Sequence, residues 1–302
     1  MRFKPILERI LVPIDGTSGS LAAMQLATLI AKVFKSKVTV IHAISNELTS
    51  LEYQYASLIT EGSGAPFGSP SPIPAELIKV YNEIENSFYR KGEEILRQAV
   101  AFFKEQGIAA DEKLVEHVEP ATAIMKQALE GIYDLIVIGR RGDEEKGPHL
   151  GSTTVKVAHH AEIPVLIVRQ SGKISNVLIA FDGSQNAERA LQYGAYLAKN
   201  IRAKMTVLYV CHSELSRLRP EQVREAGNHI LSRASEILEE TNLDQRVELG
   251  NPAETIIHVA QQGEYDLIVL GSKGHGAVER FLLGSVSEHV IHYADSSVLL
   301  VR

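Results

Sequence analysis

Short runs of apolar residues alternate along this chain with longer segments in which apolar residues recur at helical spacing. The first run, Ile10 to Ile14, precedes such a periodic segment from Leu21 to Phe34, and a β-branched run from Val38 to Ala43 follows. Short apolar runs are typical of buried strands, and a spacing of three to four residues is typical of amphipathic helices. The order strand, helix, strand favours a parallel sheet covered by helices, so we predict an α/β fold.

The same alternation continues to the middle of the chain. It predicts strands at Leu114 to Val118, Tyr133 to Ile138 and Pro164 to Val168, and helices from Pro120 to about Glu130 and from Ser152 to His160. Pro120 suits the first turn of a helix, where its missing N–H group costs nothing.

The alternation is interrupted once. Glu61 to Pro74 is rich in Pro, Gly and Ser and predicts a loop, and Ala75 to Gly107 predicts a long amphipathic helix. A break in this helix near Lys91-Gly92 is left open. We favour packing of the helix on the sheet over a dedicated partner site.

The pattern then repeats in the second half of the chain. Val177 to Ser184 repeats Ile10 to Thr17, and Tyr265 to Gly271 repeats Tyr133 to Gly139. The spacing between equivalent positions shows that the extra residues of the first copy lie between its second and third strands. We therefore predict two domains, residues 1–170 and 174–302, with an insertion at about 46–90 in the first.

The second copy carries a glycine-rich segment between its fourth strand and the next helix, with Gly271, Gly274 and Gly284-Ser285. Glycine lets the backbone approach a ligand, and a helix that begins at Gly284-Ser285 directs N–H groups and a positive dipole end at an anion such as phosphate. Neither a P-loop nor a Gly-x-Gly-x2-Gly fingerprint occurs. The segment predicts a phosphate-binding loop.

This spacing, Gly-x2-Gly-x9-Gly-Ser, resembles the nucleotide motif of the universal stress protein family. Apart from the insertion, the whole chain resembles two tandem domains of that family. The resemblance implies a flavodoxin-like (adenine nucleotide alpha hydrolase-like) fold in each half, with five parallel strands and helices on both faces. In such open sheets, ligands bind at the carboxyl ends of strands where the strand order reverses.

The resemblance further implies that the second half binds ATP, or ADP or AMP in its place, with Mg²⁺ accompanying ATP. The implied contacts come from the ends of two strands, the glycine loop and the helix start: Ala180, Phe181, Asp182, Val210, Gly271, Lys273, Gly274, Gly284, Ser285, Val286 and Ser287. Without its partners, Asp182 reads as a helix-cap or turn residue.

The matching positions in the first half are Asp15, Ala43, Gly139, Gly142, Gly151 and Ser152. Eight residues rather than nine separate Gly142 from Gly151, and they include Asp143-Glu144-Glu145. Each carboxylate near a polyphosphate costs on the order of 1 kcal/mol at surface dielectrics, although Arg140 and Arg141 offset part of this. Binding by the first half is left open.

Composition narrows the functional classes. The net charge of −6 and the lack of a basic cluster give no support to nucleic-acid binding. A single cysteine, Cys211, excludes an internal disulfide, and no apolar run reaches membrane-spanning length, so we expect a cytoplasmic protein. No His-Glu-x2-His motif and no nucleophile elbow occurs, so we expect neither a metal site nor a catalytic residue, with slow ATP hydrolysis left open.

Two functional hypotheses follow. The first is a stress-response regulatory protein that binds an adenine nucleotide with little or no hydrolysis. The alternative is a nucleotide-free interaction module that recruits a partner through the inserted helix. The last strands, Pro164 to Val168 and Ser297 to Val301, are short and apolar. The family resemblance implies that they pair the two halves within one chain, and a homodimer of whole chains is left open.

Overall fold

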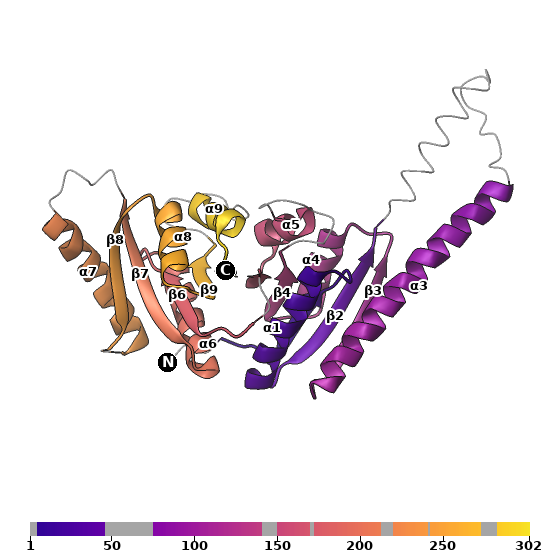
Figure 1. Cartoon of the computed structure of the whole chain (residues 1–302), viewed down its shortest axis with the longest axis horizontal. Helices are drawn as coiled ribbons and strands as arrows, with labels where there is room; N and C mark the ends of the chain where they lie inside the picture. Colours follow the sequence, from indigo (N-terminus) through magenta and orange to yellow (C-terminus); the bar gives the residue numbers. More distant parts are fainter. Residues whose placement is uncertain are drawn as a thin grey trace, which may run out of the picture.

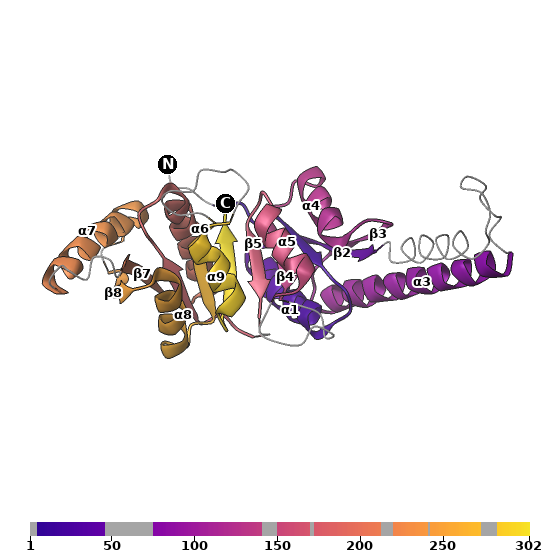
Figure 2. The same ribbon diagram turned by 90° about the horizontal axis from the view of Figure 1, so that it is seen from above.

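The computed structural model describes residues 5–45, 75–140, 150–169, 172–212, 220–240, 242–272 and 283–302. Two α/β halves lie side by side and share one sheet (Figures 1 and 2). Four predicted features lie outside the described residues: Gly142, Lys273, Gly274 and the loop 61–74.

The described elements follow the predicted alternation in both halves. The first half contains β1 (Arg9–Pro13), α1 (Ser18–Phe34), β2 (Lys37–Ile44), α3 (Ala75–Glu105), β3 (Ala110–Glu116), α4 (Pro120–Glu130), β4 (Leu135–Gly139), α5 (Ser152–His160) and β5 (Val165–Val168). The second half contains β6 (Asn176–Ala180), α6 (Gln185–Ile201), β7 (Lys204–His212), α7 (Pro220–Leu238), β8 (Asp244–Gly250), α8 (Pro252–Gln262), β9 (Leu267–Gly271), α9 (Ser285–Tyr293) and β10 (Ser297–Val301).

The strand order across the sheet is β3-β2-β1-β4-β5-β10-β9-β6-β7-β8. All pairs within a half are parallel, whereas β5 and β10 pair antiparallel, with Leu166 opposite Leu299. The predicted fold of five parallel strands in each half is confirmed. The predicted pairing of the halves through their last strands is also confirmed.

Each strand contributes to two cores because helices cover both faces of the sheet. In β1, Ile10 and Val12 belong to the core under α1, and Leu11 belongs to the opposite core under α4 and α5; all three are fully buried. Burial on both faces explains why these strands read as continuous apolar runs rather than as alternating ones.

Two arginines join the halves in a pseudo-symmetric way. The Arg169 guanidinium, after β5, donates hydrogen bonds to the carbonyls of Ile291 and His292 at the end of α9, at 2.7 and 2.9 Å. Arg302, after β10, donates to the carbonyl of Ala158 near the end of α5. Burial lowers the pKa of Arg302. A cation at a helix C-terminus interacts favourably with the helix dipole, so each half helps to hold a helix of the other.

The repeated Tyr-Asp pairs have a structural role at the other end of the strands. The Asp134 carboxylate accepts hydrogen bonds from the backbone N–H groups of Glu8 and Arg9, both at 2.9 Å. Asp266 accepts in the same way from the N–H groups of Ser175, just before β6, and of Asn176, its first residue, at 2.7 and 2.9 Å. These carboxylates hold the start of the first strand of each half against the fourth.

The third strand differs from its prediction. It runs from Ala110 to Glu116 rather than from Leu114 to Val118, and His117 leaves it with φ +57°. β3 lies at the end of the sheet, where one side has no neighbouring strand, and Asp111, Glu112 and Lys113 are exposed. Because these three residues are charged, the first part of β3 has no apolar run from which the sequence could have predicted it.

The long helix α3 is continuous through Gly92. A Cβ at this position would lie 3.0 Å from the His42 ring and 3.1 Å from Leu114, so glycine allows the helix to lie close to the sheet. Beyond Gly92 the helix buries Leu96 and Phe103. Its N-terminal part instead extends past the sheet (Figure 1) and exposes large apolar side chains there, such as Ile84. The predicted packing on the sheet therefore holds for the C-terminal part only.

Candidate functional site

The predicted second-half site lies where the strand order reverses. The chain runs from β6 outward to β7 and β8, and then returns to β9 on the other side of β6. Asp182 follows β6, and Gly271 ends β9. The structure thus brings the two strand ends that carry these residues together at the crevice position of a doubly wound sheet.

Asp182 forms a tight turn before α6. Its Oδ1 accepts a hydrogen bond from the N–H of Ser184 at 2.9 Å, and Gly183 has φ +81°, which favours glycine. Ser184 then caps α6 by accepting from the N–H of Ala187 at 3.2 Å. Asp15 repeats this turn in the first half. The turn role fixes where the carboxylate lies, and it leaves the nucleotide role of Asp182 as a prediction.

Gly271 has a steric role within the protein. A Cβ here would lie 2.8 Å from the carbonyl carbon of Asn186 in the first turn of α6. At Gly139, the equivalent distance to the backbone of Gly19 is 2.5 Å. Both glycines therefore let a helix start rest directly on a strand end. From the sequence we expected Gly271 to let a ligand approach the backbone. In the structure, it lets the first turn of α6 approach.

The start of α9 lies against the end of β9. The Ser287 hydroxyl donates to the carbonyl of Gly271 at 2.8 Å, and the N–H of Gly284 donates to the carbonyl of Ser272 at 2.8 Å. Among the described residues, no side chain caps the helix at Gly284. Its first N–H groups, which include those of Ser285 and Val286, thus form a donor set at the positive end of the helix dipole, suited to an anion.

The first half repeats this arrangement at Gly151 and Ser152. In the part of the chain that the structure describes, no side chain caps α5, and the N–H of Gly151 donates to the carbonyl of Arg140 at 3.0 Å. The Thr154 hydroxyl donates to the carbonyl of Gly139 at 2.8 Å. Thr154 was missed by the sequence analysis. The signal that would have found it is a hydroxyl residue three positions after the last glycine in both copies.

The remaining wall of the second-half site comes from the ends of β6 and β7. The side chain of Phe181 is buried in the core, so only its backbone faces the strand end, and its N–H donates to the carbonyl of Leu208 at 2.9 Å. Ala180 and Val210 are half-buried.

Tyr209 of β7 was also missed by the sequence analysis. Burial raises the pKa of its phenol, and the neighbouring Cys211 and Asp182 raise it further. It therefore stays a hydrogen-bond donor at neutral pH.

In the first half, the equivalent strand ends meet α3. Asp15, His42 and Ala43 line a cavity of about 160 Å³ together with Phe88, Lys91 and Ile95 of α3. The His42 ring nitrogen Nδ1 lies 2.8 Å from the carbonyl oxygen of Ile14. Sites for small molecules usually measure about 300–1,000 Å³. The structure thus brings Asp15 and Ala43 together as predicted, in a space smaller than this range.

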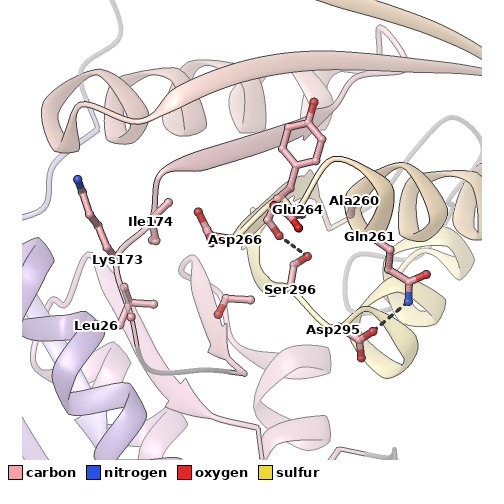
Figure 3. A pocket seen from close by; sticks show the side chains of 12 residues that line it. Leu26, Lys173, Ile174, Ala260, Gln261, Glu264, Asp266, Asp295 and Ser296 are labelled. Atoms are coloured by element: carbon pink, nitrogen blue, oxygen red, sulfur yellow. Dashed lines mark hydrogen bonds between the residues drawn. The ribbon is translucent and has the colours of Figure 1, made fainter.

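A larger cavity, of about 430 Å³, lies at the opposite end of the strands, between the linker and the ends of α8 and β10 (Figure 3). Its polar groups bond to one another: Asp295 accepts from the Gln261 amide at 2.9 Å, and the Ser296 hydroxyl donates to the carbonyl of Tyr265 at 2.6 Å. These two hydrogen bonds join α8 and Tyr265 to the residues before β10, and Lys173 of the linker also lines the cavity.

Metal-binding clusters and membrane-spanning helices are both absent from the part of the chain that the structure describes. In that part, no three His, Cys, Asp or Glu side chains gather in a way that could hold a metal ion. The described helices also include none with the length and apolar character of a membrane span. Cys211 is buried there without a disulfide partner.

Comparison with known proteins identifies relatives of both halves. The family model described as the universal stress protein family matches residues 69–169 and 173–302. A universal stress protein of Synechocystis is 23% identical over 304 residues, which cover 98% of this chain and 100% of that protein. A relative in Staphylococcus haemolyticus, whose name refers to the same family, is 35% identical over 142 residues, 42% of this chain and 84% of its own length.

Solved structures share the fold along almost the whole chain. The crystal structure of a universal stress protein from Archaeoglobus fulgidus superimposes with a TM-score of 0.66 at 21% identity. The match covers 97% of this chain and 98% of the other. At this level of identity, the likeness shows a shared fold.

Proposed function

The chain belongs to the universal stress protein family, and on this premise we propose that its second half binds an adenine nucleotide, ATP with Mg²⁺ or else ADP or AMP. The activity that we propose is binding with little or no hydrolysis. Binding then acts as a signal in a stress response, because a ligand that prefers one conformation shifts the population towards it.

The observation that carries this proposal is the uncapped start of α9, held against the end of β9 by the Ser287–Gly271 hydrogen bond. Three backbone N–H groups in the first turn supply donors and a positive dipole end for phosphate oxygens. The Asp182 turn follows β6, the strand that pairs with β9, and we propose that the ribose or base lies against this turn.

The limited hydrolysis that we propose follows from how the nearby groups are used. One oxygen of Asp182 already accepts a backbone hydrogen bond in its turn, and the Ser287 hydroxyl is committed to a carbonyl. A general base needs a carboxylate or imidazole within hydrogen-bond reach of the attacking water. These side chains hold the backbone in place instead.

A proline at the first position of α9 tests the phosphate site directly. Ser285→Pro removes one N–H donor and keeps the helix, because Gly284 already has the extended ψ of 147° that a residue before proline needs. A hydrogen bond to a charged group contributes about 1.5–3 kcal/mol, so we expect ATP to bind roughly 10- to 100-fold more weakly in calorimetry.

The first half offers a matched control. Gly151 has ψ 148° before Ser152, so Ser152→Pro makes the same change at the start of α5 and should leave second-half binding unchanged. Asp182→Ala provides an independent test of the base and ribose side. Unchanged ATP affinity in both Ser285→Pro and Asp182→Ala would remove the site assignment.

One observation favours the alternative, a nucleotide-free interaction module. The part of α3 beyond the sheet exposes Val80 at 49% and Ile84 at 38%, and exposed apolar side chains on a projecting helix are typical of contact surfaces. Natively purified protein without nucleotide, and with no thermal shift in excess ATP, would favour this alternative over nucleotide binding.

A further inference from the structure

The two halves differ in the helix that packs on their second and third strands and reaches the turn after the first strand. This helix is α3 in the first half and α7 in the second, with 31 and 19 residues. We propose that Phe88 and Lys91 of α3 exclude adenine nucleotides from the first-half crevice. Each chain then binds one nucleotide, in the second half, and this second statement rests on the proposed function.

The two helices can be aligned residue by residue from their contacts. A Cβ added at Gly92 would meet His42 and Leu114, which lie opposite each other on β2 and β3. A Cβ added at Gly227 would meet Tyr209 and Val247, which lie opposite each other on β7 and β8.

A second contact gives the same alignment. Three residues further along each helix, Ile95 lies over Gly16, and Ile230 lies over Gly183. Gly92 and Gly227 are therefore equivalent, and the residues before them can be compared directly.

The comparison shows what faces each crevice. One position before the glycine, α3 has Lys91 and α7 has Ala226; four positions before it, α3 has Phe88 and α7 has Val223. Val223 is buried, whereas Phe88 is 42% exposed and lines the first-half cavity. The first half thus places an aromatic ring and a long cationic side chain where the second half has a short apolar one and a methyl group.

The remaining space supports exclusion. The cavity bounded by Asp15, Ala43, Phe88 and Lys91 measures about 160 Å³, about half of the smallest usual ligand site. A ligand on Asp15 would have to displace Phe88 and leave the Lys91 ammonium against its base. Of the predicted first-half residues, Asp15 and Ala43 thus line a small cavity that Phe88, Lys91 and Ile95 of α3 also bound.

Counting bound ligand in the full chain tests the proposal. Adenosine is the probe, because it has no phosphate and the carboxylates of Asp143-Glu144-Glu145 then do not matter. By equilibrium dialysis with labelled adenosine, we expect one equivalent on the wild-type chain and two on the Phe88→Val/Lys91→Ala double variant. The gained equivalent should disappear when Asp15→Ala is added.

Two neighbouring residues of α3 provide the matched control. Tyr89→Val/Arg90→Ala removes an aromatic ring and a cation from the same helix, and neither residue lines the cavity; the wild-type count should be kept. The reciprocal variant Ala226→Lys changes an exposed position of α7 and should weaken second-half adenosine binding at least tenfold, even if the double variant fails to fold.

The outcomes separate the two proposals. Two equivalents on the wild-type chain, no gain in the folded double variant, or an unchanged affinity in Ala226→Lys would overturn the role of Phe88 and Lys91. If the wild-type chain bound neither adenosine nor ATP, and the double variant bound one equivalent of adenosine, the proposed function of the second half would be refuted and the role of α3 would stand.

Discussion

Replacing Gly271 by alanine tests whether this glycine is needed for packing within the chain. The added Cβ would lie 2.8 Å from the carbonyl carbon of Asn186 and 2.9 Å from its oxygen, whereas unstrained contacts lie at about 3.5–4.0 Å. The first turn of α6 is backbone and cannot rotate away, so the helix must shift by several tenths of an ångström. Overpacking of this kind costs about 1–3 kcal/mol.

Urea unfolding with an unchanged m-value measures this loss. Gly139→Ala should cost at least as much, because its Cβ would lie 2.5 Å from the backbone of Gly19. Gly250→Ala is the control: the neighbour there is the hydroxyl of Thr255, which can rotate, so we expect a loss below about 0.5 kcal/mol.

The result that would refute the reasoning is a Gly271→Ala protein as stable as the Gly250→Ala control. If ATP affinity nevertheless fell in that variant, the glycine would be needed for the ligand, as the sequence first suggested. If Gly271→Ala kept both its stability and its ATP affinity, this glycine would be needed neither for packing nor for the ligand.

Three further predictions concern stability. Tyr193 is buried, and its hydroxyl has no hydrogen-bond partner among the described residues, so Tyr193→Phe should raise the free energy of unfolding by about 1 kcal/mol. Burial raises the pKa of the Tyr193 phenol, so the unfolded chain loses this proton at a lower pH than the folded chain does. The wild-type protein should therefore lose stability as the pH rises above about 10. In a urea series at about pH 9–11, Tyr193→Phe should lose less stability than the wild type does. Arg169→Ala should cost about 1–3 kcal/mol in thermal unfolding, because it removes the donor to the carbonyl of Ile291 and leaves that of His292 with only the longer bond from Arg140, at 3.4 Å. A loss below about 0.3 kcal/mol would contradict the role of this arginine between the halves. Glu119 caps α4, so Glu119→Ala should cost about 0.5–1 kcal/mol at pH 7. Partial burial opposes ionisation of Glu119, but hydrogen bonds from Thr122 and Lys156 outweigh it and lower the pKa of this carboxyl. The difference in stability between Glu119→Ala and the wild type should therefore vanish as the pH falls through that pKa. A difference that persists at about pH 2 would count against the cap.

The element pattern and the duplication could be predicted from the sequence because they depend on local composition. A strand buried on both faces must be apolar throughout, as β1 and β9 are, and this signal survives without knowledge of its neighbours. The exception is β3, whose charged residues are tolerated because it lies at the end of the sheet.

The sequence predicted where two of the candidate site residues lie in the fold, and their nucleotide role stays a prediction. The turn at Asp182 and the helix start at Gly284 follow from residue types with strong backbone preferences, and the structure places both at adjacent strand ends. The sequence could not show that Gly271 faces α6 or that Ser287 bonds to it, because both contacts join segments that are distant along the chain.

The amino-acid sequence by itself thus determined the two copies, their strands and helices, and the strand ends where polar and glycine residues gather. Only the tertiary structure decided that the copies form one continuous sheet through antiparallel β5 and β10, and that α3 brings Phe88 and Lys91 to the cavity at Asp15. The physical reason is that backbone preference and burial are recorded locally. The volume left in a crevice instead depends on which distant helix packs over it and on the size of the side chains it brings.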